Sequence, residues 1–163
     1  MPKYASMFAL AVLLLTATNT SASGPKADLS AFDQTRLTIQ TQDGNRHFDV
    51  FVAKTSEQHR RGLMHVKELP RKQGMLFIHE YDAIRSMWMR NTYIPLDMLF
   101  ISADGEVRNI AADTVPFSLD AVRSDGPVRA VLELNAGTAK KLGINAGDRV
   151  IHEFFELQPA DPP

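Results

Sequence analysis

The sequence predicts a mainly β domain, a compact antiparallel jelly-roll-like sandwich or barrel with two short helices. Apolar and polar residues alternate over many short runs, which is the period of a half-buried strand. Turn-forming pairs such as Asp43-Gly44 and Asp104-Gly105 separate these runs. Only two stretches carry helix signals, and two helices are too few to cover both faces of a parallel sheet.

The first elements form a hairpin. Residues 36–40 alternate around two apolar side chains, and the pair Asp43-Gly44 follows as a strong turn signal. Beyond the turn, one face of the chain is apolar at Phe48, Val50 and Val52, which predicts a half-buried second strand.

Two helices are predicted from the residues at their ends. Thr55 and Gln58 have the spacing of a capping box, so a short helix should begin there and end at Gly62. Asn135 is expected to cap the second helix, which runs through Leu142. The remaining apolar runs between turns bring the total to about eight short strands: residues 74–78, 86–92, 97–102, 107–113, 128–134 and 149–157.

The N-terminal segment is expected to be a cleaved signal peptide. Lys3 precedes an unbroken apolar run at residues 7–15, and small residues around Ala22 and Ser23 follow it. The run is shorter than the ~20 apolar residues of a transmembrane helix. The sequence therefore predicts a signal peptide at residues 1–23, a flexible leader at 24–33, one β domain at 34–157 and a disordered tail at 158–163. It also predicts a periplasmic or secreted bacterial protein without a transmembrane segment after cleavage.

Composition narrows the possible functions. The chain of 163 residues fits one domain. It has no cysteine, so disulfides, thiol catalysis and thiolate metal sites are excluded. Removing Lys3 leaves 17 basic against 19 acidic residues, a net charge of −2 that argues against a nucleic-acid partner. No cofactor motif is present, and no cofactor is predicted.

Several short motifs resemble the domain-of-unknown-function 192 family. The likeness extends over roughly residues 37–157 and implies a compact, mainly β, jelly-roll-like fold and, often, a signal peptide, but no activity. This chain has Met87 where an aromatic residue is common in the family. The motifs, in order, are Arg61-Gly-Leu-Met64, Gly74-Met-Leu-Phe77, Trp88-Met-Arg-Asn-Thr92, Ile94-Pro-Leu-Asp97, Val131-Leu-Glu-Leu134, Ala136-Gly137 and Gly147-Asp148.

The candidate binding residues are gathered around the only tryptophan. In a strand, Trp88, Arg90 and Thr92 would share a face, where indole could stack on a ring and guanidinium could hold an anion. The alternative is a structural ion pair beside a core tryptophan. We predict that Arg90 contacts Asp97, Glu133 or both, because an unpaired charge is costly to bury. The candidate ligand-binding set is Trp88, Arg90, Asn91, Asp97 and Glu133.

Three functional hypotheses follow. The first is an exported, non-catalytic domain that binds a small anionic or sugar ligand, or serves as an accessory domain. The second is an envelope polysaccharide hydrolase, which requires the carboxyl groups of Asp97 and Glu133 to converge. The third is a periplasmic copper protein that uses the thioethers of Met87 and Met89, with His65 nearby. Methionine more often fills core gaps, and the five histidines form no metal motif, so no metal site is predicted.

Overall fold

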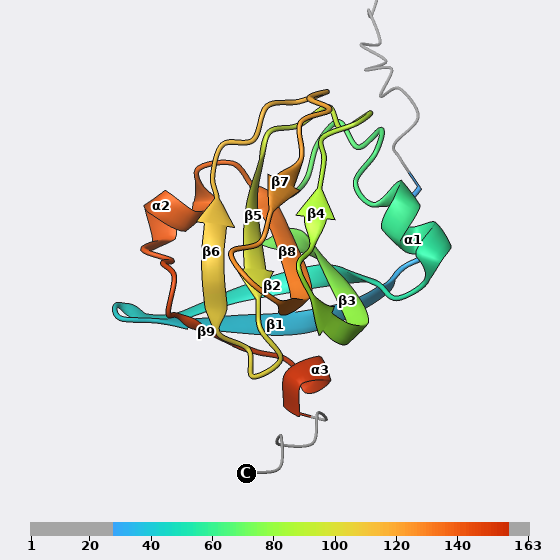
Figure 1. The fold of residues 1–163 in the computed structure, drawn as a ribbon. Helices are drawn as coiled ribbons and strands as arrows, with labels where there is room; N and C mark the ends of the chain where they lie inside the picture. Colours follow the sequence, from blue (N-terminus) through green and yellow to red (C-terminus); the bar gives the residue numbers. More distant parts are fainter. Residues whose placement is uncertain (1–27, 157–163) are drawn as a thin grey trace, which may run out of the picture.

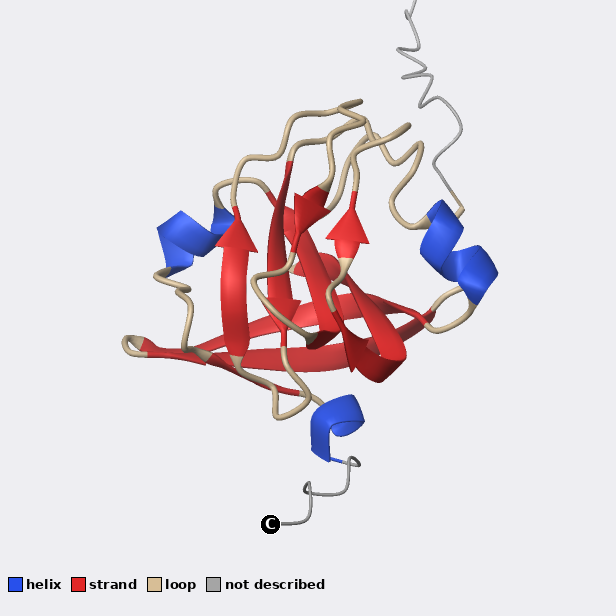
Figure 2. Ribbon diagram, viewed as in Figure 1, coloured by secondary structure: helices blue, strands red, loops and turns tan. Residues whose placement is uncertain are grey.

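The computed structural model describes residues 28–156, and the mainly β prediction is confirmed (Figures 1 and 2). The predicted signal peptide at residues 1–23, the start of the leader and the tail at 158–163 lie outside this range. Within it the chain forms nine strands and three short helices. None of these helices combines the length and the apolar character needed to cross a membrane.

Seven of the strands form one sheet in the order β6-β5-β8-β3-β2-β1-β9. Neighbouring strands are antiparallel except β2 and β3, which run parallel and so correct the all-antiparallel prediction. The parallel pair arises because helix α1 (Ser56–Arg61) and the loop after it carry the chain back between the two strands. The strands are β1 Asp33–Thr41, β2 Gly44–Ala53, β3 Gln73–Ala83, β5 Leu96–Ile101, β6 Val107–Ala111, β8 Val128–Asn135 and β9 Arg149–Ile151.

The predicted first hairpin is present. Strands β1 and β2 pair from Asp33 opposite Val52 to Thr41 opposite Gly44, which leaves a two-residue turn. Gly44 has a φ of 110°, a backbone conformation that side-chain-bearing residues rarely adopt. The capping box is also confirmed, because Thr55 and Gln58 satisfy each other's backbone amides at the start of α1.

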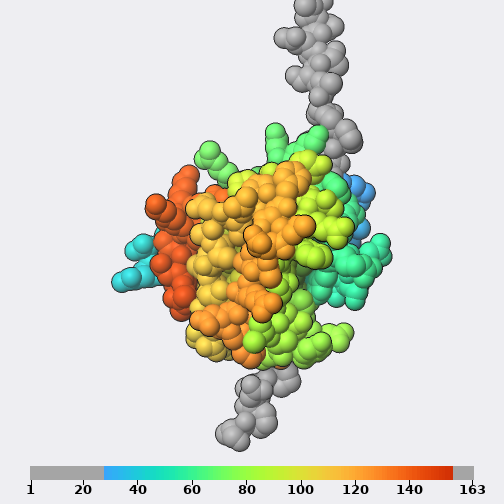
Figure 3. Space-filling model, turned by 45° about the horizontal axis from the view of Figure 1, so that its top comes forward, coloured from blue at the N-terminus to red at the C-terminus, as the bar shows by residue number. Residues whose placement is uncertain are grey.

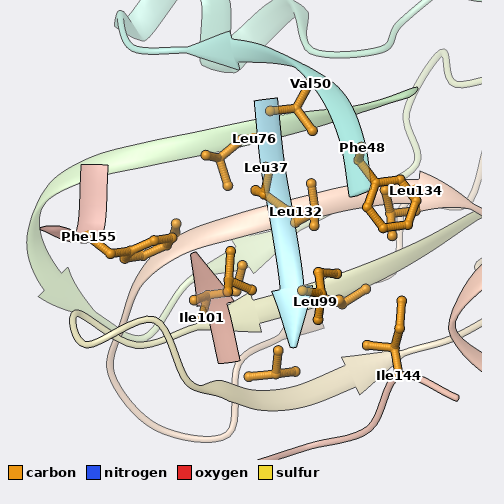
Figure 4. Packing of buried hydrophobic residues seen from close by; sticks show 14 of the residues in the cluster. Leu37, Phe48, Val50, Leu76, Leu99, Ile101, Leu132, Leu134, Ile144 and Phe155 are labelled. Atoms are coloured by element: carbon orange, nitrogen blue, oxygen red, sulfur yellow. The ribbon is translucent and has the colours of Figure 1, made fainter. Parts of the chain in front are cut away.

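The sheet curls until its two edge strands meet. Glu106, just before β6, forms a bridge with Arg149 of β9. The Val150 amide donates to the Gly105 carbonyl at 2.8 Å, and the Val107 amide to the Asp148 carbonyl at 2.9 Å. The curled sheet encloses an apolar core that includes Leu37, Phe48, Val50, Leu76, Leu99, Ile101, Leu132, Leu134, Ile144 and Phe155 (Figure 4).

A second apolar cluster lies on the opposite face of the same strands. Successive residues of β8 show the division, because Leu132 belongs to the enclosed core and Val131 to the second cluster. Residues from the loops after α1 and before β5 join it, as does the two-stranded ribbon of β4 (Ser86–Met87) and β7 (Val122–Arg123). The members are Phe32, Ala53, Leu63, Val66, Leu69, Met75, Phe77, Met89, Leu96, Met98, Phe100, Val128 and Val131.

Three local predictions are wrong. The expected strand at residues 86–92 stops at Met87, because the next residues turn back and Asn91 adopts a φ of 55°. The expected strand at 149–157 ends at Ile151 and is followed by helix α3 (Glu153–Glu156). Asn135 does not cap helix α2 (Thr138–Leu142); its side-chain amide instead donates to the Leu69 carbonyl at 2.9 Å.

Candidate functional site

A pocket of about 250 Å³, here called the Glu133 pocket, opens beside the second cluster. Helix α1 and the three residues after it form one wall, strands β3 and β8 supply side chains from the sheet, and the segment from Ser86 to Thr92 closes the other side. It is lined by His59, Arg60, Arg61, Gly62, Leu63, Met64, Phe77, His79, Ser86, Met87, Trp88, Arg90, Thr92 and Glu133.

Glu133 is the most unusual residue of the pocket. It is 4% exposed, and no hydrogen bond or ion pair joins its carboxyl group to any other residue in 28–156. Burial without a charged partner raises the pKa of Glu133 to about 8, because desolvation disfavours the carboxylate. At neutral pH the group is therefore mostly a carboxylic acid, which can donate one hydrogen bond and accept others.

His79 supplies a second polar group without a partner. Its Nε2 atom is buried and has no hydrogen-bond partner among the described residues. Its ring meets that of His59 edge-on, with centroids 4.7 Å apart. Burial first, then the positive charges of Arg85 and His59, lower the pKa of His79 to about 4, so the imidazole is neutral at pH 7.

Phe77 separates these two polar groups. Alternation along β3 places Met75, Phe77 and His79 on one face, and Met75 pairs with Glu133. His79 and Glu133 thus lie about 13 Å apart along the strand direction, measured between backbone positions, with the Phe77 ring between them. The pocket combines an apolar surface with polar groups toward its two ends.

Gly62 allows α1 to end against this surface. It has a φ of 46°, and a Cβ atom there would lie 3.0 Å from Cζ of Phe77. A larger residue would therefore be strained and would press on the Phe77 ring. Gly62, which the sequence predicted as the end of this helix, therefore also lets α1 form a wall of the pocket.

Trp88 and Arg90 form the exposed side of the pocket. Trp88 is 51% exposed, and the Arg90 guanidinium lies over its ring, 5.7 Å from the centroid. The turn that carries them is held by the Met89 amide, which donates to the Ser118 carbonyl at 3.1 Å. In Figure 3 the yellow-green residues of this region lie beside the orange loop between β6 and β7.

The predicted contact of Arg90 with Asp97 or Glu133 is wrong. Within residues 28–156 no ion pair forms between Arg90 and a carboxylate, and its charge is exposed rather than buried. Arg61, which also lines the pocket, donates to the Asp28 carbonyl and lies over the Phe32 ring at 5.7 Å. Both arginines line the pocket, and neither compensates the buried acid.

Asp97 does not belong to this site. In the β5–β8 pairing Asp97 faces Leu134 and Met98 faces Glu133, so the Asp97 and Glu133 side chains leave opposite faces of the sheet. Asp97 is 0% exposed and accepts three backbone amides, from Asp113 at 3.0 Å, Gly137 at 3.1 Å and Ala139 at 2.8 Å. Asp97 therefore holds the start of α2, which was the role expected of Asn135. The carboxyl groups of Asp97 and Glu133 do not converge, although the hydrolase hypothesis requires that they do.

The two methionines of the copper hypothesis are also separated. Met87 lines the pocket, whereas Met89 is 1% exposed in the second cluster and its Sδ atom accepts the Thr114 hydroxyl at 3.2 Å. His65, the proposed nitrogen ligand, lies outside the pocket lining beside the Tyr93 ring. Residues 28–156 contain no group of three or more His, Asp or Glu side chains that could hold a metal ion.

Asn91 stabilises the backbone of the turn and is not among the residues that line the pocket. Its side-chain amide lies 3.9 Å from Sδ of Met64, and its carbonyl accepts the His65 amide at 2.9 Å. Its positive φ makes the turn that presents Trp88 and Arg90. Of the five candidate residues, the structure therefore brings Trp88, Arg90 and Glu133 together.

Sequence reasoning did not single out His79. The predicted strand ended at residue 78, although the alternation of Met75 and Phe77 continues to His79 on the same face. That continuation was an available signal that His79 is turned toward the protein rather than toward solvent.

Comparisons with known proteins agree with the fold. The model of the DUF192 family, described as uncharacterized ACR, matches residues 38–152. The crystal structure of a "putative transcription regulator" from Sinorhizobium meliloti is 41% identical, with a TM-score of 0.72 over 74% of this chain and 94% of that one. A protein of unknown function from Novosphingobium aromaticivorans is 37% identical, with a TM-score of 0.75 over 84% of this chain and 99% of that one. No curated protein matches this chain.

Proposed function

The chain belongs to the DUF192 family, and we propose a function for it from the geometry of its site: the Glu133 pocket binds a small ring-bearing carboxylate, such as a sugar acid. The observation that carries this proposal is the Glu133 carboxyl group, buried in the pocket without a partner among residues 28–156. Buried polar groups are nearly always hydrogen-bonded, and a ligand in the pocket that Glu133 lines can supply the partner that residues 28–156 do not.

The other lining residues define the ligand class. The half-exposed Trp88 ring offers a stacking surface, and Arg90 beside it can hold a carboxylate. Inside, the neutral Glu133 and His79 can exchange hydrogen bonds with hydroxyl groups. A pyranose ring that carries one carboxylate matches Trp88, Arg90 and one of these two polar groups, which lie toward opposite ends of the pocket, and it fits the volume better than a larger molecule would.

The proposed activity is binding without chemistry. Hydrolysis of a glycosidic bond generally needs two carboxyl groups on the two sides of that bond. Glu133 is the only Asp or Glu in the lining of the pocket within residues 28–156, and Asp97 lies on the other face of the sheet. Ligand binding therefore accounts for the pocket without a further reacting group.

Glucuronate should raise the Tm of the protein, because a ligand of the native state stabilises it by mass action. Trp88→Ala should abolish the rise while changing the free energy of unfolding by only about 0.5 kcal/mol or less, since the ring is half exposed. Thermal-shift and urea titrations measure the two quantities.

Matched variants separate the parts of this proposal. Trp88→Phe should restore part of the Tm rise, and Arg90→Gln should reduce the preference for glucuronate over glucose. Tyr81→Ala, which removes another exposed aromatic ring outside the pocket, should leave binding unchanged. A Tm that glucuronate, neutral sugars and aromatic carboxylates all leave unmoved would count against the pocket as a binding site.

The proposal also places the protein outside the cytoplasm, supported by the order of charge, apolar run and small residues in the first 23 positions. We expect exported material to begin near Ser23 or Gly24. Intact-mass measurement of the periplasmic or secreted fraction tests this, and a full-length mass in membranes would contradict it.

A further inference from the structure

A second concave surface, here called the basic groove, lies away from the Glu133 pocket. It has a volume of about 780 Å³, within the range of sites for small organic ligands. Strand β2, the loop before β3, the loop after β8 and helix α2 form it. In Figure 1, α2 and the tip of the β1–β2 hairpin are seen on the same side of the molecule.

The charges around this groove have one sign. Four basic side chains, Arg46, Arg71, Lys72 and Lys141, line it, and no Asp or Glu of the described residues 28–156 does. Within residues 28–156 no ion pair joins any of the four to a carboxylate. Since the whole chain has nearly equal numbers of basic and acidic residues, four unpaired cations in one concavity mark a local anion-attracting surface.

The four cations fall into two pairs. Nε of Arg46 donates to the Leu142 carbonyl at 2.9 Å, which places Arg46 beside Lys141 on the side of α2. On the other side, the Lys72 carbonyl accepts the Asp49 amide at 2.9 Å, and Arg71 is its neighbour. Arg46 and Asp49 are three residues apart on β2, so the two pairs are separated by roughly 10 Å along the strand.

Apolar groups lie between the two pairs. Leu69 and Phe48 are buried and line the groove together with the half-buried Leu142. The side-chain amide of Asn135 is already used by the Leu69 carbonyl. An occupant would therefore meet cations toward its ends and carbon surface along its middle.

We propose that the basic groove binds a small organic bis-anion, with two phosphate groups on a sugar-sized body. Two phosphates would face the two cation pairs, and the carbon skeleton would cover the apolar floor. The structure favours such a ligand over nucleic acid, because the cations surround one concavity instead of following a stripe. In addition, the longest helix within residues 28–156 has six residues, and the net charge of the chain is −1.

Fructose 1,6-bisphosphate is the test ligand, and isothermal titration at low salt is the measurement. We expect saturable binding, no binding of neutral fructose, and weaker binding as salt rises. Arg71→Gln/Lys72→Gln should weaken binding about tenfold or more, because charge-assisted hydrogen bonds are lost. Lys141→Gln, on the opposite side, should also weaken it.

Two controls make the result specific. Arg108→Gln/Arg123→Gln removes two exposed charges outside the groove and should change the affinity by less than about twofold. Trp88→Ala should leave bisphosphate binding intact, so the result is independent of the Glu133 pocket. The proposal is overturned by equal losses in the control pair, by equal binding of fructose, by absence of bisphosphate binding, or by duplex DNA that binds more tightly and displaces the sugar.

Discussion

Replacing Glu133 with Gln should stabilise the protein at alkaline pH. The folded protein holds the Glu133 pKa at about 8, whereas an unfolded chain releases the proton near the ordinary value of 4.5. Between these values the native state binds the proton and the unfolded state does not, so the free energy of unfolding falls as pH rises. Gln has nearly the shape of the neutral acid and removes this titration.

The expected difference between the two proteins depends on pH. Below pH 4.5 it should be small, and it should then grow by about 1.4 kcal/mol per pH unit to roughly 5 kcal/mol near pH 8. His79 has the opposite sign, because its lowered pKa makes the wild-type protein less stable as pH falls from 6.5 toward 4. His79 is present in both proteins, so its contribution cancels in the difference.

Urea unfolding at a series of pH values measures this difference. The matched control is Glu80→Gln, an exposed glutamate on β3, whose effect should vary little with pH. Under the proposed function, Glu133→Gln should also weaken glucuronate binding. The wild-type glutamate would then serve binding although it lowers the stability of the protein at alkaline pH. A difference between wild type and Glu133→Gln that stays constant from pH 4 to pH 8 would show that Glu133 is not held protonated by burial.

Replacing Asp97 with Ala should be the most damaging single change among the predicted site residues. It leaves three backbone amides without their acceptor: the amide of Ala139 is buried, and those of Asp113 and Gly137 are partly buried. An unsatisfied buried amide typically costs about 1–3 kcal/mol and a partly buried one costs less, so we expect the three losses together to lower the free energy of unfolding by roughly 3–5 kcal/mol. Asp97→Asn should also destabilise, because its NH₂ group would meet amide donors.

The comparison variant is Asp125→Ala, an exposed aspartate in a turn, which should change stability by no more than about 0.5 kcal/mol. Urea midpoints and soluble yield measure both variants. If Asp97→Ala is as stable as Asp125→Ala but has lost glucuronate binding, then Asp97 acts in the ligand site and its structural assignment here fails.

The sequence determined those features that depend on neighbouring residues. Alternation around Phe48, Val50 and Val52 was enough to place a strand, and the turn at residues 42–43, just before Gly44, follows from backbone preferences within a few residues. The capping box of Thr55 and Gln58 is likewise complete within one turn of helix. Family membership followed from the order of short motifs along the chain.

Only the tertiary structure decided which side chains meet. The face of the sheet on which the Asp97 or Glu133 side chain lies depends on the register of β5 against β8. That register is fixed by the pairing of two strands that lie far apart in the sequence. The partners of Asp97 come from a loop and a helix start far along the chain, and Glu133 lines the same pocket as Trp88, which lies 45 residues before it in the sequence. Composition and periodicity carry no information on such contacts, because a local pattern specifies an alternating face but not the element that covers it.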